Sequence, residues 1–457
     1  MKTKWLFFLT TCLAIALSSC LKTEDEIVIE LTKNCQIKSF TLSSDSVSGL
    51  SSVKFTIDQL TGRIFNLDSM PYGTKIEKVV CTIEVASSYD VAGVEVSPYA
   101  LPDSTYYLSS LSDSIDFSAP VKITMHAYDG MTTKTYIAQV NIHQVNPNTM
   151  IWAQAANPML PVAVRAQKTV ETNFEGKASY FSYVEPVNGD GYQLYQAAVS
   201  DPTQWTQLSL SGLPADSVQL LQMTYYNNML YVAAGNGALY RSTDGQNWSV
   251  VEGAPTVRVL FGEIKAGIRQ QAVLAAAADN EGTLVFCTMN EEGEWTTGIS
   301  VPETFPASGF TTLQYESMHY QYLMVVGGRS IENQLLNTTW TTSNGLAWER
   351  LASGTKSFTQ REGAMATHYD DQLYLIGGLD ADQKGLKDMY RSIDYGVTWT
   401  LVDSMLVLPE EFEGRGFASI IVDQTNFINL FGGKTSREGN DINQLWRGRI
   451  NRLIPKE

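Results

Sequence analysis

The sequence predicts an all-β protein in two parts, an N-terminal β-sandwich and a six-bladed β-propeller closed by its own first strand. Two observations carry this prediction. Residues 27–146 hold short alternating strands separated by Gly, Pro, Ser and Asp turns, without useful helical periodicity. From residue 148 onward, tryptophans, inner-strand starts, strand-ending glycines and strand-opening aromatics recur about every 50 residues. Such recurrence is the signature of a repeat architecture.

The first residues have the form of an export signal. Two lysines precede an apolar run over residues 5–17, which is too short to span a bilayer. The run ends in Leu17, Ser18, Ser19 and Cys20. This ending resembles the lipobox of bacterial lipoproteins, which implies that residues 1–19 are removed and that a lipid on Cys20 anchors the protein to a membrane. An ordinary signal peptide is the alternative.

A charged tether, residues 20–26, follows the signal. It resembles the acidic signal that directs lipoproteins of Bacteroidetes-type bacteria to the outer face of the outer membrane. That resemblance implies a surface-exposed lipoprotein, with a plain linker or a periplasm-facing protein as alternatives. The whole chain carries 32 Lys and Arg against 48 Asp and Glu, a net charge of −16. Such acidity argues against DNA, RNA or anionic lipid as the partner.

Three cysteines remain after the export segment, and they cannot all pair. A disulfide between Cys35 and Cys81 is one alternative in an oxidising envelope, and buried free thiols, with Cys287, are the preferred one.

The N-terminal region contains expected strands at 52–58, 78–86 and 121–128. Asp129 and Gly130 form a hairpin turn before the last strand, residues 136–143. The segments 117–121, 128–130 and 134–136 resemble the Ig-like modules that precede larger domains in Bacteroidetes surface lipoproteins. The resemblance implies an Ig-like β-sandwich over 27–146 that acts as a stalk.

Four sets of marks divide the propeller, residues 148–457, into six blades. The tryptophans are Trp152, Trp205, Trp248, Trp295, Trp348 and Trp399. The innermost strands start near Arg165, Gln219, Arg258, Gly309, Arg361 and Arg415. A hydrophobic strand ends in glycine, with doublets at 327–328, 377–378 and 432–433. An aromatic opens the next strand at Tyr195, Tyr240, Phe286, Trp340, Tyr390 and Trp446.

The ends of the repeat predict a circular closure. The last blade has its aromatic at Trp446 but no later tryptophan, whereas Trp152 precedes the first inner strand. We therefore expect the strand around 151–153 to complete the sheet begun at Arg415, bringing residue 150 against residue 446. Such closure removes exposed strand edges.

The blade over residues 361–399 resembles a Kelch repeat, and its end matches the Asp-box through Ser392, Asp394, Gly396 and Trp399. Shorter relatives of this box lie at 242–248 and 343–348. In such a turn the Asp accepts backbone hydrogen bonds, the Gly supplies a positive φ and the Trp packs beneath the hairpin. We expect a structural role.

The candidate ligand-binding residues are Arg165, Arg258, Arg361 and Arg415. All four start inner strands, so they could ring one mouth of the propeller with forked, charge-assisted donors. The favoured alternative is that they bond to backbone carbonyls between blades. Asp-boxes also occur in sialidases, whose chemistry needs an arginine cluster, a tyrosine nucleophile and acidic partners. No such tyrosine and glutamate can be singled out, so we predict no catalytic residue and lean against an enzyme.

No metal or cofactor is expected. The histidines, His126, His143, His319 and His368, are scattered without ligand spacing. The segment 380–391 has Lys384 and Arg391 where a calcium loop needs oxygen ligands. Nucleotide-binding and hydrolase glycine motifs are absent from the sequence.

The whole layout resembles a family of Bacteroidetes lipoproteins of unknown function, with a lipid anchor, an Ig-like module and a Kelch-like propeller. We therefore expect an exported, membrane-anchored protein that binds a protein or glycan at the arginine-bearing face. A sialidase-like glycan hydrolase and a structural component of an envelope assembly are the alternatives.

Overall fold

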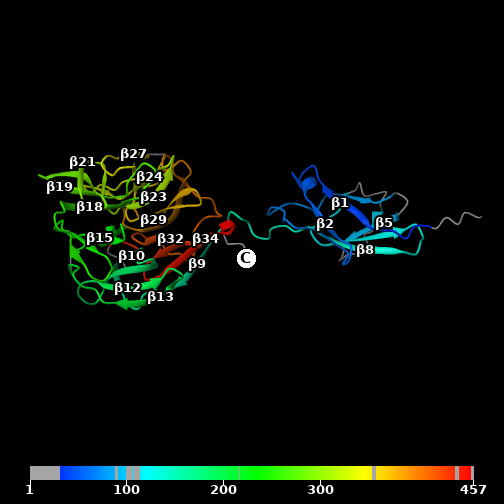
Figure 1. Ribbon diagram of the computed structural model, residues 1–457, viewed down its shortest axis with the longest axis horizontal. Coiled ribbons are helices and arrows are strands. Elements are labelled where there is room, and N and C mark those ends of the chain that lie inside the picture. Colours follow the sequence, from blue (N-terminus) through cyan, green and yellow to red (C-terminus); the bar gives the residue numbers. More distant parts are fainter. Residues whose placement is uncertain are drawn as a thin grey trace, which may run out of the picture. The chain divides into compact units, whose positions relative to one another are not determined.

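The computed structural model describes residues 31–87, 91–98, 106–107, 114–215, 217–352, 357–437 and 442–453. The expected signal peptide, Cys20 and the tether lie outside these residues. The chain forms two compact units, Met1–Asn146 and Pro147–Glu457 (Figure 1). The described residues form strands and short 3-10 helices only, which confirms the all-β prediction. None of the described helices is long and apolar enough to cross a membrane.

The described residues of the N-terminal unit form two sheets. In the smaller sheet, β1 (Ile37–Ser43) pairs with β4 (Val80–Val85). The larger sheet has the order β2-β3-β8-β7-β5-β6. Its strands are β2 (Phe55–Asp58), β3 (Arg63–Asn66), β5 (Val91–Pro98), β6 (Tyr106–Tyr107), β7 (Val121–Ala127) and β8 (Thr133–Gln139). The pair β3–β8 is parallel.

The core of this unit follows from alternation along its strands. In β7 the side chains of Val121, Ile123 and Met125 are buried, and the residues between them are more exposed. Cys35 and Cys81 are buried free thiols. The structure therefore agrees with the expectation of free thiols and not with a Cys35–Cys81 disulfide.

The C-terminal unit contains six four-stranded antiparallel sheets among the described residues. The first three are β10 (Val164–Phe174), β11 (Lys177–Pro186), β12 (Gln193–Ala198) and β13 (Asp201–Leu208); β14 (Thr224–Tyr226), β15 (Met229–Ala233), β16 (Leu239–Ser242) and β17 (Ser249–Val250); and β18 (Thr256–Ile264), β19 (Val273–Asn280), β20 (Thr283–Met289) and β21 (Trp295–Ser300).

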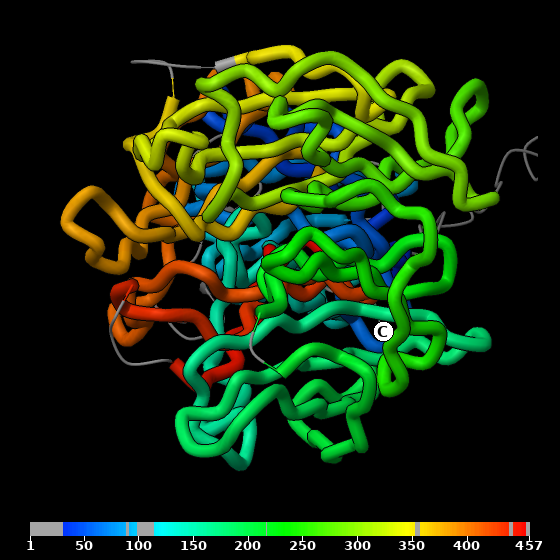
Figure 2. Tube along the Cα trace, turned by 90° about the vertical axis from the view of Figure 1, so that its left-hand side faces the viewer, coloured from blue at the N-terminus to red at the C-terminus, as the bar shows by residue number. Residues whose placement is uncertain are grey.

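The next two sheets are β23 (Thr311–Ser317), β24 (Tyr320–Val326), β26 (Thr339–Thr342) and β27 (Glu349–Ala352); and β28 (Met365–Tyr369), β29 (Gln372–Leu379), β30 (Gly385–Ser392) and β31 (Thr400–Leu401). The last sheet joins β32 (Ser419–Val422), β33 (Ile428–Phe431) and β34 (Leu445–Ile450) to β9 (Met150–Ala156). A short extra pair links β22 (Pro306–Ser308) and β25 (Arg329–Ser330). In Figure 2 the sheets follow one another around a ring, from cyan-green through yellow and orange to red.

The two ends of this unit share one sheet, because β9 pairs with β34. Met150 lies opposite Ile450, Trp152 opposite Gly448 and Gln154 opposite Trp446. Residue 150 therefore pairs four positions further along than the expected partner at 446, although Met150 and Trp446 belong to one hydrophobic core. The Trp152 indole packs onto Gly448, where an added Cβ would lie 2.5 Å from the ring.

Glycine doublets and tryptophans join neighbouring sheets. Gly377 has a φ of 57°, and a Cβ there would lie 2.5 Å from the Arg415 carbonyl oxygen of the next sheet. Trp399 is 4% exposed, and its Nε1 donates a hydrogen bond to Thr339 Oγ1 of the preceding sheet at 3.0 Å. The glycine doublets and the tryptophans therefore reflect close packing between sheets.

Candidate functional site

The innermost strands of the ring enclose a central cavity of about 360 Å³. All six sheets, or the segments that lead into them, contribute to its wall. The lining includes residues 168–171, 221–225, 260–261, 310–312, 314, 363–364 and 417–421. Since so many separate segments converge there, the cavity is the natural place for a ligand of this fold.

Two further hollows adjoin the cavity, one on each side. The start-side hollow, about 390 Å³, lies at the starts of the innermost strands and shares Leu221, Gln222, Phe310 and Phe417 with the cavity wall. The end-side hollow, about 420 Å³, lies at the ends of those strands and shares Thr224, Thr312, Gln314 and Ile420. A ligand could therefore approach from either face.

Lys168 of β10 is the cationic side chain in the cavity wall. Its side chain is partly exposed to the cavity, yet the protein atoms crowded around it lower its pKa to about 8 through desolvation. Among the described residues, none forms an ion pair or a hydrogen bond with its ammonium group. The cavity thus holds a cation without a protein counterion.

Two carboxylates and a second lysine surround the other end of the cavity. Glu171 lines the cavity, and its pKa is raised first by burial and then by the negative charge of Asp423, against the influence of Lys265. Glu263 lines the end-side hollow, and burial raises its pKa against the same Lys265 and a hydrogen bond from Gln314. Both carboxyl groups therefore hold their protons to higher pH than ordinary glutamates.

A buried ion pair lies at the start-side hollow. Arg329 Nη2 donates to Glu362 Oε1 at 2.9 Å, and Arg437 Nη2 lies 3.7 Å from Glu362 Oε2. Glu362, Arg437 and Lys434 all line this hollow. The sequence analysis singled out none of these residues, because their charges do not recur from one repeat to the next.

Two of the four predicted arginines, Arg361 and Arg415, have no exposed surface. Arg361 donates to the Gly377 carbonyl at 2.8 Å and to both oxygens of Asp388 at 2.7 and 2.9 Å. Arg415 donates to the Gly432 carbonyl at 3.1 Å, and its guanidinium lies 4.3 Å from the Phe412 ring centre. A side chain without exposed surface cannot touch a ligand, so these two fit the structural alternative.

The other two arginines are exposed at the surface. Arg165 Nη1 lies 3.1 Å from Glu185 Oε1, and Glu185 lines the start-side hollow. Arg258 Nη2 lies 3.4 Å from Asp279 Oδ2. The structure thus divides the four arginines into two buried braces and two surface ion pairs, instead of presenting one exposed set.

The Asp-box residues form a self-contained turn. Ser392 Oγ donates to Asp394 Oδ1 and accepts from the Gly396 amide, each at 2.8 Å. Asp394 also accepts from the Thr398 amide at 2.8 Å and hydroxyl at 2.7 Å. Burial would raise the pKa of Asp394, but these hydrogen bonds outweigh it and lower the pKa. Its partners are local, as a structural turn requires.

Metal ligands do not gather in the described part of the chain, where no three His, Cys, Asp or Glu side chains are arranged to hold an ion.

Comparisons with known proteins identify the family. Residues 146–456 match the DUF6242 beta propeller domain, and residues 29–140 match the DUF6242 N-terminal domain, a domain of unknown function. No curated protein matches the chain in sequence. A solved structure titled "Structure of YjhT" aligns with a TM-score of 0.45 and 12% identity, covering 63% of this chain and 95% of that chain. The C-terminal ring is therefore a β-propeller, and the chain belongs to the DUF6242 family.

Proposed function

We propose that the propeller is a glycan-binding module whose ligand places an acidic sugar in the central cavity, beside Lys168. The observation that carries this proposal is the unpaired ammonium in the cavity wall. Removing a cation from water without a counterion is unfavourable, and a bound anion reverses that penalty. A carboxylate on a sugar supplies such an anion, and a cavity of about 360 Å³ has room for one such residue.

Calorimetric titration of the full chain with glucuronate and galacturonate, and with glucose and galactose, tests this proposal. We expect saturable binding of the acidic sugars only. The Lys168→Met variant should bind them at least about tenfold more weakly, because it removes one charge-assisted contact. The matched control is Lys177→Met, since Lys177 is exposed at the start of β11, on the same hairpin. Equal binding of acidic and neutral sugars, or full binding by Lys168→Met, would refute the proposal.

The affinity for the acidic sugar should change with pH in a defined direction. The ammonium form of Lys168 binds the anion, and its pKa in the free protein is about 8. Affinity for the acidic sugar should therefore be highest below pH 8 and should fall as the pH rises above it. A flat profile between pH 6 and about pH 10 would mean that Lys168 is not the contact.

A second candidate function, a glycan hydrolase, is favoured by the carboxyl groups of Glu171 and Glu263. Both have raised pKa values and lie at the cavity or at its end-side hollow. A carboxyl group whose pKa is raised suits general acid catalysis, because it keeps its proton to higher pH. Release of nitrophenol from nitrophenyl glycosides, abolished in Glu171→Gln, would establish this function; no turnover would leave the binding role alone.

We further infer the architecture and the cellular location of the whole protein. The six four-stranded sheets correspond to six Kelch-type blades, and the pairing of β9 with β34 corresponds to circular closure. The two-sheet N-terminal unit serves as an Ig-like stalk, and a lipid on Cys20 holds the protein at the outer membrane, facing outward.

The lipid anchor has a direct test. In cells, Cys20→Ala should shift the protein from the membrane fraction to the soluble fraction, because acyl chains supply the membrane affinity. A protease added to intact cells should remove the anchored protein if it faces outward. A membrane-bound Cys20→Ala variant would contradict the anchor.

A further inference from the structure

The Asp-box at 392–399 contains one residue more than its two relatives. Tyr395 stands between Asp394 and Gly396, whereas Asp244 and Asn344 are followed directly by Gly245 and Gly345. In all three turns the glycine amide donates a hydrogen bond to the hydroxyl group of the first side chain, which belongs to Ser242, Thr342 or Ser392. Tyr395 adopts a φ of 53°, which is unfavourable for a bulky side chain. The turn works without this residue, so the tyrosine calls for another explanation.

The Tyr395 ring is the outermost of three stacked tyrosines. Its centroid lies 5.1 Å from that of Tyr315 with an interplanar angle of 21°, and Tyr315 lies 5.1 Å from Tyr322 at 10°. Tyr315 is 6% exposed and its hydroxyl lies 3.1 Å from Thr341 Oγ1, whereas Tyr395 is 42% exposed. A fixed inner ring therefore supports an outer ring that faces solvent.

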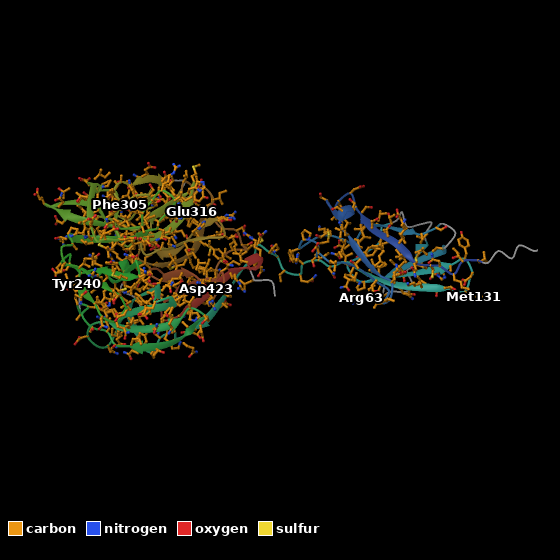
Figure 3. All side chains as sticks on the ribbon, in the orientation of Figure 1. Arg63, Met131, Tyr240, Phe305, Glu316 and Asp423 are labelled. Atoms are coloured by element: carbon orange, nitrogen blue, oxygen red, sulfur yellow. The ribbon has the colours of Figure 1, made fainter. Side chains whose placement is uncertain are left out.

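A polar surface hollow of about 580 Å³ lies beside this ring. Glu316, labelled in Figure 3, accepts a hydrogen bond from Gln321 Nε2 at 2.9 Å. The polar side chains of the hollow include Glu316, His319, Gln321 and Asp371. It shares Lys265, Gln314 and His368 with the end-side hollow, which adjoins the central cavity. The surface is thus continuous from the Tyr395 ring to the cavity.

We propose that Tyr395 and the hollow beside it form a carbohydrate-stacking subsite for a neutral sugar. The face of an aromatic ring carries negative charge density, which attracts the weakly positive C–H groups on the flat face of a pyranose. The hydroxyl groups at the edge of the same sugar need both acceptors and donors. Glu316 and Asp371 supply acceptors, and Gln321 and His319 supply donors.

This subsite extends the proposed function, and it rests on that function for the idea that one glycan reaches both Lys168 and Tyr395. A glycan with its acidic residue in the cavity would leave by the end-side hollow and stack a following neutral residue on Tyr395. The stacking itself requires no negative charge on the sugar. Binding at Tyr395 can therefore be measured separately from binding at Lys168.

In the test, the full chain is titrated with neutral hexasaccharides built from glucose, mannose, xylose or galactose. Binding is measured by saturation-transfer NMR and by calorimetry. The informative variant is Tyr395→Gly, because glycine accepts a positive φ and the turn keeps its hydrogen bonds. We expect this variant to weaken binding of at least one hexasaccharide by about tenfold or more, and Tyr395→Phe to keep the wild-type affinity. The matched control is Tyr320→Ala, since Tyr320 is 38% exposed at the start of β24 on the adjacent hairpin.

The outcomes separate the two proposals. If Lys168→Met loses uronate binding but Tyr395→Gly binds every hexasaccharide normally, the stacking subsite is wrong and the cavity site stands. If Tyr395→Gly loses hexasaccharide binding and uronates never bind, the subsite stands and the cavity proposal fails. Absence of hexasaccharide binding to the wild-type protein overturns the subsite. The subsite is also wrong if the tyrosine stack binds a proline-rich peptide and no hexasaccharide.

Discussion

At the scale of single residues, the propeller uses similar cations for opposite purposes. Arg361 is completely buried, with its donors on a backbone carbonyl and a carboxylate. Lys168 faces a cavity and has no such partner in the described part of the chain. A buried charge with complete hydrogen bonding supports the fold, whereas an unpaired one lowers stability and is available to a ligand.

Arg361→Met should therefore destabilise the propeller by about 3 kcal/mol, because it leaves Asp388 and the Gly377 carbonyl without their donor. The control Arg165→Met should change stability by no more than about 0.5 kcal/mol, since Arg165 is an exposed ion-pair residue. Urea unfolding of the full chain measures both. Similar losses in the two variants would contradict the division of the arginines into braces and surface pairs.

Lys168→Met should have the opposite effect and stabilise the unliganded protein. The folded-state pKa of about 8 lies below the unfolded value, so the unfolded state binds more protons between the two values. The folding penalty of Lys168 is therefore complete below pH 8 and fades as the pH rises above it. We expect a gain on the order of 1 kcal/mol at pH 7, allowing for partial exposure, and little gain near pH 11. A variant less stable than wild type at pH 7 would make Lys168 a structural residue.

At the scale of elements, the Asp-box turns tie each hairpin to the neighbouring sheet. Gly396 packs against Met324 and Thr339 of the preceding sheet, while Asp394 holds the turn through Thr398 and Ser392. The lowered pKa of Asp394 means that its contribution to stability is complete above its unfolded pKa. That contribution is lost as the pH falls through the folded value.

Asp394→Ala should thus cost about 2 kcal/mol at pH 7, from the loss of its local hydrogen bonds. The difference from wild type should begin to shrink below the unfolded pKa of about 4, and it should be lost as the folded carboxylate becomes protonated at still lower pH. Thermal unfolding at pH 7 and pH 3 checks this expectation, and a difference that stays constant with pH would contradict it.

The repeating elements could be predicted from sequence because each mark reports a packing constraint that recurs. Trp399 and Gly377 stand where one sheet meets the next, and the glycine contact recurs at Gly327, where an added Cβ would lie 2.9 Å from the Arg361 carbonyl oxygen. The site residues lack this regularity. Lys168 looks like an ordinary polar position of a strand, and only the convergence of the innermost strands places it in a cavity. Tyr395 was visible only as an extra residue, because its stacking partner Tyr315 lies on another sheet.

At the scale of the whole molecule, the family match establishes a propeller preceded by an N-terminal domain. The sheet order adds that β9, next to the junction with the N-terminal unit, pairs with β34 near the C-terminus. Without β9, the strand β34 would be an edge, and an uncovered edge invites pairing with other chains. The sheet that contains β34 therefore depends on a segment that precedes all the other described strands of this unit.

This arrangement predicts different behaviour for two truncated chains. A chain that starts at Pro147 keeps β9 and should unfold cooperatively as a monomer. A chain that starts at Asn157 lacks β9, so it exposes Trp446 and the β34 edge. It should melt about 2–8 °C lower, because a loss of about 1–2 kcal/mol lowers Tm by about 2–4 °C per kcal/mol in large domains, and it should self-associate. Calorimetry and sedimentation distinguish the two. Restoring the missing strand as a separate peptide of residues 147–156 should recover the monomer if edge pairing is the cause, whereas no recovery would mean that the unpaired edge of β34 is not what causes self-association.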